Sequence, residues 1–534
     1  MEKIPFRHAR NVLGRAKLRS NPPHPRAKSG LTSGTEAPGS ETPGPKPGRR
    51  GTLRADFTAS IVVFLIAVPL SVGIAVASGV PVELGLVTGV VGGLLTGLLP
   101  GSSLQVSGPA AGLTVLVYEA VQEYGLQALG MLVLAAGLLQ VAMGVLRLGR
   151  WFRAISVAVV QGMLAGIGLV LIAGQLYALA DSHPPGGGLA NLSGVPGLIA
   201  DTVGSPDALS AVAVGAGTVL VLALWPKWRA GVRVLPAPLA AVALATIAVA
   251  VLSLPVARVE VSGVLHAVQP PDGAEFARLG EIGVLGTVVA FALIASAESL
   301  FSAAAVDRLH DGPRTDYDKE LIAQGAGNTV CGVLGALPMT AVIVRSAANV
   351  RAGARTKASR VLHGLWLLIF AALLPWALGV IPVAALAGVL IHAGWKLLPG
   401  RDLVRLWQQH RGEAVVLVVT SGAIVATNLF EGVLLGLLMA VAKAAWESSQ
   451  VHVETIAAAN GVVRARVLGN ANFLRLPKLL DELEALPGPG RDVELDLSGM
   501  RHMDHACKAA LTAWAERNAE PVAAAGPLSA RRET

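Results

Sequence analysis

The sequence predicts an all-α polytopic membrane protein, a seven-plus-seven transmembrane inverted repeat, followed by a small cytoplasmic α/β domain. Three observations lead to this fold class. Only 15% of the 534 residues are charged, against about 25% in a soluble domain, and the mean hydropathy is +0.60. Apolar stretches of membrane-spanning length recur along the chain. The charges gather near both ends and in short segments between these stretches, as in loops and tails around membrane spans.

Residues 1–53 are expected to form a disordered basic tail in the cytoplasm. Twelve Lys or Arg stand against three Glu in residues 1–54, and Pro, Gly and Ser are frequent in residues 21–51. Such a segment buries too little apolar surface to fold. A solvated tail that helps to fix orientation is one interpretation. Attraction to anionic headgroups or nucleic acid is the alternative.

Fourteen apolar segments are expected in residues 54–447, in repeats 56–254 and 282–447. Two of them, Gly108–Glu119 and Thr340–Asn349, are too short to cross the hydrocarbon core alone and follow turns that contain proline. Each is third in its series of seven, as expected of half-helices that meet at mid-membrane in inverted-repeat transporters. The twelve longer segments are Phe57–Ser78, Leu84–Leu99, Ala128–Leu146, Ile155–Leu179, Leu209–Trp225, Leu235–Leu254, Ile282–Val306, Leu321–Leu337, Ala358–Ile381, Val383–Leu398, Ala414–Asn428 and Gly432–Trp446.

Basic residues in alternate loops predict that both termini lie in the cytoplasm, below a bacterial-type inner (plasma) membrane. With this orientation, the outside loops carry only Arg258 and Arg278, which is the positive-inside pattern. The inside loops carry Arg147, Arg150, Arg153, Lys227, Arg229, Arg233, Arg308, Arg314, Lys319, Arg351, Arg355, Lys357, Arg360, Lys396, Arg401, Arg405 and Arg411.

The turns before the two short segments are candidates for an anion site. They read QVSGPAAGLT over residues 105–114 and GALPMTAVIVR over residues 335–345. Proline at a helix start gives up a donor that would be unpaired anyway, and small residues let an ion approach the free N–H groups. Two such N-termini facing each other would create positive potential without a full charge.

Two charges fall within predicted spans. Arg345 is expected about one and a half turns into its half-helix, where a cation is costly unless it faces a cavity or a partner. Snorkelling to the cytoplasmic edge is the alternative. Glu298 is suited to carry a proton because burial disfavours the charged form, or to coordinate a cation with Ser302 one turn on. A structural ion pair between Glu298 and Arg345 is the other interpretation.

The first span contains Pro69 and Gly73, which indicate a break in the helix. A break is tolerated where the freed carbonyls line a cavity, and Ser71 would then form a wall of the site. A plain kink at Pro69 explains the same residues.

Together these motifs resemble the SulP family of inorganic anion transporters, bacterial relatives of the SLC26 carriers. They run in family order and are specific to it, and they are closest to the branch that often occurs beside or fused to carbonic anhydrases. Resemblance to that branch favours bicarbonate as cargo. The segments that carry the resemblance are Ala67–Ser78, Val106–Leu113, Glu298–Asp307, Lys319–Gly325 with Gly327 and Asn328, Leu337–Arg345 and Ser346–Thr356.

The resemblance implies that the seven-plus-seven transmembrane inverted repeat is divided into core and gate domains. It also implies an anion held between the third and tenth helices, with Glu298 at the acidic position of the eighth. Sodium-coupled bicarbonate members have aspartate there, whereas proton-coupled sulfate members have glutamate. Hydroxyls expected at the start of the tenth helix are partly replaced by valine and isoleucine, so both departures argue against sodium coupling. The expected binding residues are Ser71, Ser107, Gly108, Pro109, Ala110, Thr340, Ala341, Val342 and Arg345, with Glu298 and Ser302 for ion coupling.

The expected function is therefore secondary active transport of a small inorganic anion of the sulfate or bicarbonate class. Alternating access would drive proton-coupled symport or anion exchange. Sodium-coupled bicarbonate uptake, an anion channel and a non-transporting sensor on the same fold are the alternatives. An enzyme such as a membrane-bound carbonic anhydrase is not expected, since no convincing Cys and His set for zinc occurs, and neither is a cofactor or metal. The expected partners are the anion, membrane lipid, a second copy in a homodimer and a carbonic anhydrase working alongside; nucleic acid is not among them.

Residues 452–520 are expected to form a shortened STAS-like domain, before a tail at 521–534. Val462–Val467 alternates like a strand, Leu474–Leu486 has helical spacing, and Val493–Met500 ends a strand in a turn. The resemblance places Asp496, Ser498, Gly499 and Asp504 at the signature positions of that domain.

The residues around Asp504 decide what this domain is expected to do. Asp504 is followed by His505 and Ala506, so the hydroxyl phosphorylated in anti-sigma antagonists is missing, and a role in assembly is expected. His502, Asp504, His505 and Cys507 resemble a metal cluster but lack a second ligand pair elsewhere. A helix start accounts for them equally well.

Overall fold

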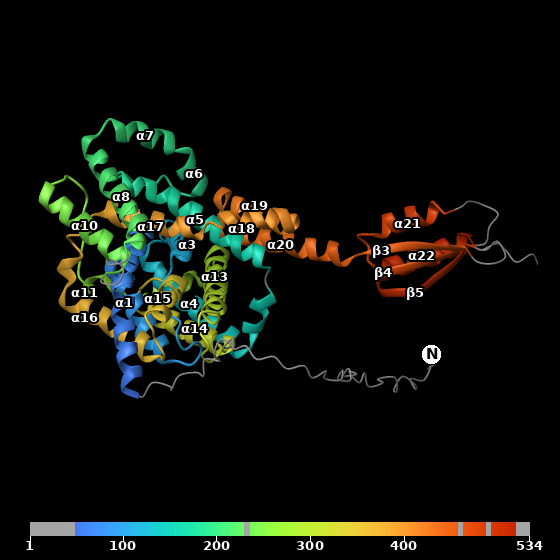
Figure 1. Ribbon diagram of the computed structural model, residues 1–534, viewed down its shortest axis with the longest axis horizontal. Coiled ribbons are helices and arrows are strands. Elements are labelled where there is room, and N and C mark those ends of the chain that lie inside the picture. The colour runs from blue at the N-terminus through green and yellow to red at the C-terminus, as the bar shows by residue number, and fades with distance from the viewer. Residues whose placement is uncertain (1–48, 155, 229–234, 458–462, 487–492, 519–534) are drawn as a thin grey trace, which may run out of the picture. The chain divides into compact units, whose positions relative to one another are not determined.

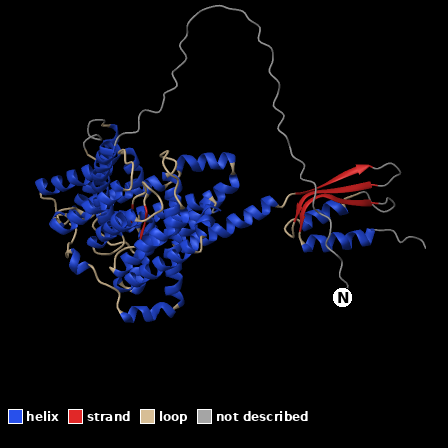
Figure 2. Ribbon diagram, turned by 90° about the horizontal axis from the view of Figure 1, so that it is seen from below, coloured by secondary structure: helices blue, strands red, loops and turns tan. Residues whose placement is uncertain are grey.

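The structure is a computed structural model that describes residues 49–154, 156–228, 235–457, 463–486 and 493–518. The expected tails fall outside these ranges, except that residues 49–53 already belong to the first helix. Within the described ranges, six helices are long and apolar enough to cross a membrane, and four shorter apolar helices accompany them. The helical part (Figures 1 and 2) therefore combines helices of membrane-spanning length with apolar helices that are shorter than a full span.

The first repeat contains an element at each of its seven expected segments. Its elements are α1 (Arg49–Ala77), α2 (Val82–Val91) continued by the π-helix η1 (Gly92–Thr96), β1 (Ser107–Pro109), η2 (Ala111–Leu113), α3 (Thr114–Tyr124), α4 (Leu126–Val145), η3 (Leu148–Ala154), α5 (Val157–Leu179), α6 (Gly188–Ser193), α7 (Val195–Val203), α8 (Pro206–Leu224), η4 (Trp225–Lys227) and α10 (Ala237–Leu252).

The second repeat follows a joint and, like the first, begins with two helices and a strand before its further helices. The joint holds α11 (Val264–Ala267), α12 (Gly273–Ala277) and η5 (Arg278–Gly280). The repeat comprises α13 (Ile282–Val306), α14 (Tyr317–Val333), β2 (Met339–Ala341), α15 (Ile343–Arg351), α16 (Ala358–Leu373), η6 (Pro375–Ala377), α17 (Val383–Leu397), α18 (Gly400–Gln409), α19 (Arg411–Ala426) and α20 (Leu429–Ser448).

The helices form two bundles, each with members from both repeats. In the first, α4 packs along α13 and α14, and α1 along α2, α15 and α16. In the second, α5 packs along α17 and α19, and α8 along α10 and α17. We call these the core bundle and the gate bundle. They meet where α1 contacts α17 and where η2 contacts α5 and α17.

The two short segments begin as strands, so the expectation that each is helical from its start is wrong. β1 and β2 form an antiparallel pair in which Ser107 is opposite Ala341, Gly108 opposite Thr340 and Pro109 opposite Met339. Figure 2 shows this strand pair enclosed by helices. Within a membrane an extended backbone must pair its N–H and C=O groups internally, and two extended segments from two repeats do so together. The helices α3 and α15 then lead away from the strand pair.

Two further features differ from the sequence prediction, one inside a helix and one at a helix end. α1 stays helical through Pro69, so no break lies there; proline removes one helical donor without ending a helix whose neighbours hold it. α16 ends at Leu373 rather than continuing to Ile381. Pro375 begins a separate 3-10 turn, because a proline disfavours helical backbone in the residue before it.

The C-terminal α/β unit has a core of its own. Its strands are β3 (Val451–Ala457), β4 (Val463–Ala471) and β5 (Val493–Met503), and its helices are α21 (Leu476–Glu484) and α22 (His505–Asn518). The sheet order is β3-β4-β5, with β3 antiparallel and β5 parallel to β4. Leu479, Leu483, Leu511 and Trp514 are among its buried residues. β3 was not predicted, and β5 continues past Met500, where a turn was expected.

Asp504 acts as the cap of α22. Its carboxylate accepts hydrogen bonds from the N–H groups of Cys507 (2.8 Å) and Phe473 (2.7 Å). The bond from Cys507 has the largest effect on the pKa of Asp504 and, together with the weaker effect of the bond from Phe473, holds that pKa below its ordinary value although desolvation raises it. This geometry is that of a helix start, the simpler of the two interpretations of the His502–Cys507 cluster.

Candidate functional site

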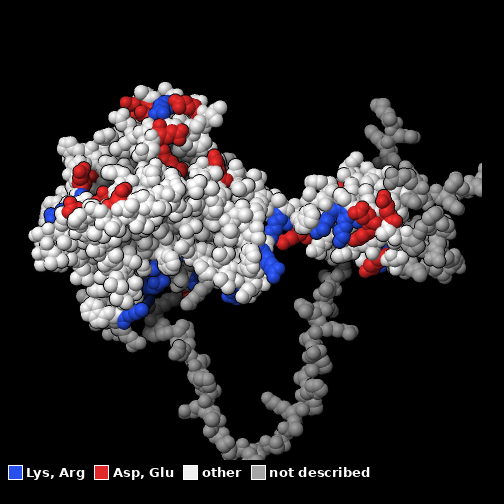
Figure 3. Space-filling model, turned by 90° about the horizontal axis from the view of Figure 1, so that it is seen from above, with Lys and Arg blue, Asp and Glu red and all other residues white. Residues whose placement is uncertain are grey.

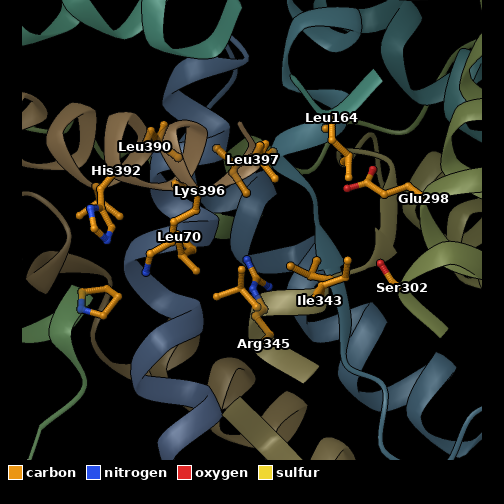
Figure 4. A pocket seen from close by; sticks show the side chains of 18 of the residues that line it. Leu70, Leu164, Glu298, Ser302, Ile343, Arg345, Leu390, His392, Lys396 and Leu397 are labelled. Atoms are coloured by element: carbon orange, nitrogen blue, oxygen red, sulfur yellow. The ribbon is translucent and has the colours of Figure 1, made fainter. Parts of the chain in front are cut away.

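A cavity of about 320 Å³ lies where the two bundles meet. The core bundle contributes residues of α1, η2, α13 and α15, and the gate bundle residues of α5, α8, α10 and α17. Most of the lining is apolar, and the polar or charged side chains on it are Glu298, Ser302, Arg345, His392 and Lys396. Figure 4 shows Glu298 and Ser302 on one side, His392 and Lys396 on the other, and Arg345 between them.

Helix starts from both repeats reach this cavity. Ala111 and Gly112 of η2 line it on one side, and Val342 with the first residues of α15 line it on the other. The N–H group of Val342 donates to the carbonyl of Val106 (2.9 Å), which anchors the start of α15 to the chain just before β1. The free N–H groups in the first turn of a helix favour an anion. The strand pair therefore holds two helix starts at one place.

Arg345 is the third residue of α15, so it lies in the first turn and not one and a half turns along. It is fully buried, and its Nη2 donates to Oγ of Ser71 (3.1 Å) and to the carbonyl of Pro109 (3.4 Å). Nε and Nη1 have no hydrogen-bond partner among the described residues. Two donors of a buried cation are thus left for a ligand, because a buried charge without a counterion is costly.

Glu298 approaches the same cavity from α13. Its Oε2 is buried without a hydrogen-bond partner among the described residues, and the Thr340 hydroxyl lies within hydrogen-bonding range of the carboxylate. A Cβ on Gly112 would lie 2.6 Å from Oε2. Ser302 lies one turn further along α13 and also lines the cavity. Because none of its described contacts joins Glu298 to Arg345, the ion-pair interpretation is not what the structure shows.

The other predicted binding residues lie around the cavity rather than on it. Ser71 holds Arg345, and Pro109 does so through its carbonyl. The hydroxyl of Ser107 accepts a hydrogen bond from Nε2 of Gln324 (2.7 Å) on α14, and the N–H of Ala341 donates to Oγ of Ser299 (3.2 Å). The remaining three are Gly108 beneath Arg345, buried Ala110 before η2 and Thr340 beside Glu298. Of the nine, Val342 and Arg345 line the cavity.

Several cavity residues were not singled out from the sequence. Lys396 was assigned to an inside loop, but it lies in the last turn of α17. His392 precedes it by one helical turn, and this four-residue spacing of two basic residues on an apolar span is a signal that could have found them. Gly112 had no such signal, because its role depends on a contact with α13.

Gly108 makes room for the guanidinium, which yields a first prediction. A Cβ at this position would lie 2.4 Å from Nη1 of Arg345, so Gly108→Ala should push the guanidinium out of place. We expect the anion concentration for half-maximal uptake to rise about tenfold, the cost of one charged hydrogen bond. The measurement is initial uptake of sulfate and bicarbonate by reconstituted protein.

The matched control for this change is Gly217→Ala on α8. An added Cβ there would meet nothing within 4 Å, so uptake should be unchanged. Equal half-saturating concentrations for Gly108→Ala and wild type would contradict the contact with Arg345.

Comparisons with known proteins agree with this architecture. Residues 53–420 match the Sulfate permease family. The putative sulfate transporter YvdB of Bacillus subtilis is 28% identical over 359 residues, which cover 64% of each chain. The bicarbonate transporter BicA of Synechocystis is 26% identical over 359 residues, covering 64% of this chain and 60% of that protein. The match thus spans less than two thirds of the length of these relatives.

Solved structures confirm the fold class. The transmembrane domain of a cyanobacterial bicarbonate transporter BicA matches with a TM-score of 0.63 at 24% identity, covering 73% of this chain and 97% of that one. Murine Slc26a9 in the inward-facing state matches with a TM-score of 0.73 at 16% identity, covering 89% and 85%. The family model spans most of the chain, and the SulP/SLC26 resemblance of the motifs is confirmed. This chain is a multi-pass membrane protein that belongs to the Sulfate permease family.

Proposed function

We propose that this chain is a secondary active transporter of a small inorganic anion, working by alternating access. One observation carries the proposal. A fully buried guanidinium and a carboxylate line one cavity without pairing with each other, and within the described residues two guanidinium nitrogens and one carboxylate oxygen have no partner. A bound anion would supply the counterion that Arg345 lacks. The helix starts at η2 and α15 would add their partial positive charge.

The substrate is proposed to be of the sulfate or bicarbonate class. Relatives named for sulfate and for bicarbonate match at similar identity, so the names alone do not separate the two anions. Either oxyanion would present several acceptor oxygens to the free N–H groups of Arg345. An enzymatic role is not proposed. The polar or charged side chains on the described lining are one carboxylate, one hydroxyl, one imidazole and two cations, and the described residues hold no metal-ligand set.

We propose a proton as the coupling ion, in symport or in exchange. A carboxylate on the cavity wall can load and release a proton when the cavity opens to either side. A sodium ion would need several oxygen ligands, and around Glu298 the described side chains that supply them are Ser302 and Thr340. Sodium-coupled bicarbonate uptake stays the alternative, as does a channel or non-transporting sensor on this fold.

Two hollows that lie toward opposite ends of α5 and α17 support alternating access. The cavity is lined by the first turns of α5 and α10 and the last turn of α17, at Val160, Pro238 and Lys396. A second hollow of about 910 Å³ is lined by Gly79, Tyr118 and other residues near the opposite helix ends. The two hollows share no lining residue. Rocking of the gate bundle against the core bundle would connect the site to each side in turn.

We place both termini in the cytoplasm of the inner (plasma) membrane. In Figure 3 most of the visible Lys and Arg of the helical part lie along one edge, and most of its Asp and Glu lie toward the opposite edge. This is the charge asymmetry that the positive-inside pattern requires. With this orientation, the cavity opens toward the cytoplasm. The domain limits 54–447 and 452–520, the STAS-like identity of the second, a homodimer and a carbonic anhydrase partner are further proposals that rest on the family resemblance.

Gradient-driven uptake by the reconstituted wild-type protein tests this function. Proteoliposomes would receive labelled sulfate or bicarbonate under an imposed proton gradient, an imposed sodium gradient, or neither. We expect uphill accumulation of at least one anion with the proton gradient and no response to sodium. Ion current without uphill accumulation would indicate a channel, and sodium-driven uptake that ignores pH would contradict the proton assignment.

A further inference from the structure

The strand β2 pairs with β1 along one edge, and its other edge faces helices instead of a third strand. In an antiparallel pair, every second residue turns its backbone groups away from the partner strand. On β2 these residues are Met339 and Ala341, since their N–H groups bond to side chains outside the sheet. Backbone groups at membrane depth must find such partners inside the protein.

Side chains of α13 and α14 take the place of the third strand. The amide of Asn328 accepts a hydrogen bond from the N–H of Met339 (2.7 Å) and donates one to its carbonyl (3.1 Å). The hydroxyl of Ser299 accepts a hydrogen bond from the N–H of Ala341 (3.2 Å). Both side chains are buried. We call Ser299 and Asn328 the edge clamp of β2.

Both members of the edge clamp lead back to α13. Ser299 belongs to this helix and follows Glu298 directly. Asn328 donates to the side-chain oxygen of Gln140 on α4 (2.7 Å), and Gln140 donates to the hydroxyl of Ser296 on α13 (3.1 Å). Helix α13 therefore holds β2 at two points, once directly and once through α4 and α14.

Ser299 contacts the first repeat as well. Its backbone carbonyl accepts a hydrogen bond from Nε2 of Gln105 (2.9 Å), which lies two residues before β1. One residue of α13 thus contacts the segments that lead to both helix starts of the site. Ser299 is not on the described lining of the cavity, whereas Val342, which follows Ala341, is. Any effect of Ser299 on a bound anion must therefore pass through the strand pair.

We propose that Ser299 is a positioning residue for the anion site, because it fixes the start of α15, and with it Arg345, relative to Glu298. Without the Ser299 hydroxyl, the N–H of Ala341 stays buried and unpaired unless the strand shifts. A shifted strand moves the first turn of α15 away from the place that fits the anion, so binding must restore it. The inference rests on the proposed function and deepens it, since it names a residue outside the cavity that sets the affinity.

The test is Ser299→Ala in the full-length protein, reconstituted in proteoliposomes. The half-saturating concentrations of sulfate and bicarbonate should rise about tenfold, as expected when a buried N–H group loses its acceptor. The maximal rate should stay near the wild-type value, because Glu298 and the contacts between the bundles are unchanged. Ser299→Thr keeps the hydroxyl and should recover most of the affinity. Gln105→Leu removes the other contact without leaving a buried N–H group unpaired, so its effect should be in the same direction and smaller.

The matched control is Ser60→Ala on α1. The hydroxyl of Ser60 is also buried and accepts a hydrogen bond from another helix, at Nε1 of Trp366 on α16 (3.0 Å). Its loss should lower the melting temperature, as that of Ser299 does, and leave both half-saturating concentrations unchanged. A Ser299→Ala protein that behaves like this control would overturn the inference. A Ser299→Thr protein with no more affinity than Ser299→Ala would contradict the role of the hydroxyl.

Calorimetry separates this inference from the proposed function. Sodium sulfate and sodium bicarbonate are titrated into the purified wild-type, Ser299→Ala and Ser60→Ala proteins, which requires no transport. Weaker binding by Ser299→Ala alone would support the inference even if the wild type moves neither anion uphill. Equal dissociation constants for Ser299→Ala and wild type would overturn it even if wild-type transport is established. A wild type that binds neither salt would overturn both.

Discussion

Replacing Arg345 with alanine is expected to abolish anion uptake while the protein still inserts, purifies and elutes as a single species. The guanidinium is fully buried, and two of its three nitrogen atoms lack a described partner. Truncating one partner of a buried, hydrogen-bonded charge pair costs about 2–5 kcal/mol, which is a loss of affinity of at least about thirtyfold. The measurement is initial uptake of labelled sulfate and bicarbonate under the gradient that drives the wild type.

Folding should survive this change because, in the part of the chain that the structure describes, Arg345 has no carboxylate partner that would be left unpaired. Its contacts are the Ser71 hydroxyl and the Pro109 carbonyl, and both belong to elements held by other packing. Sulfate should raise the melting temperature of the wild-type protein, since a ligand stabilises the state that binds it. The shift should be far smaller for Arg345→Ala.

Two further variants test whether the loss of uptake in Arg345→Ala comes from the loss of the positive charge. Arg345→Lys keeps a cation but loses the planar set of donors, so partial uptake is expected. Ser71→Ala removes one contact to the guanidinium and should have a mild effect. Wild-type uptake by well-folded Arg345→Ala protein would show that the anion binds elsewhere, and the cavity would then have to be reassigned.

The spans were predictable because the membrane leaves few choices. A segment in hydrocarbon must satisfy its backbone internally, so apolar length and loop charge together locate most of the fourteen segments. The strand pair was not predictable from local pattern, since Ser107–Pro109 pairs with residues more than 200 positions away. The continuity of α1 through Pro69 was not predictable for the same reason, because it depends on residues far away in the sequence. Whether a proline breaks a helix depends on neighbouring helices that the sequence does not place.

The site was predictable where chemistry alone singles out a residue. A charge within an apolar span is costly, so Arg345 and Glu298 were identified as functional candidates without any neighbours. Residues chosen by position in a motif, such as Ser107 and Ala341, lie beside the cavity because they pair with each other as strands. The Ser107 hydroxyl then accepts a hydrogen bond from Gln324, and the Ala341 N–H donates to Ser299. Lys396 could not be assigned to the cavity from the sequence, because that assignment requires knowing which face of α17 meets the core bundle.

Replacing Glu298 with glutamine is expected to uncouple uptake from the proton gradient while anion exchange survives. The amide resembles the protonated carboxyl in size and hydrogen bonding but can neither take up nor release a proton. The protonated form leaves the cavity with the positive charge of Arg345 uncompensated, which favours an anion, so Glu298→Gln should keep its affinity. An inward proton gradient should accelerate wild-type uptake and leave the variant unchanged. Exchange of internal for external labelled anion at equal pH is the second measurement.

Glu447→Gln is the matched control for this change, because that carboxylate is exposed near the end of α20 and pairs with Lys443 outside the cavity. It should keep the full response to the proton gradient. Thr340→Val removes the hydroxyl next to Glu298, and it should shift the pH at which uptake is half-maximal without abolishing the response. A Glu298→Gln protein that still accumulates anion under a proton gradient would rule out this carboxylate as the proton carrier. If wild-type uptake instead follows sodium, Glu298, Ser302 and Thr340 become candidate sodium ligands, and the same variant should then lose its dependence on sodium.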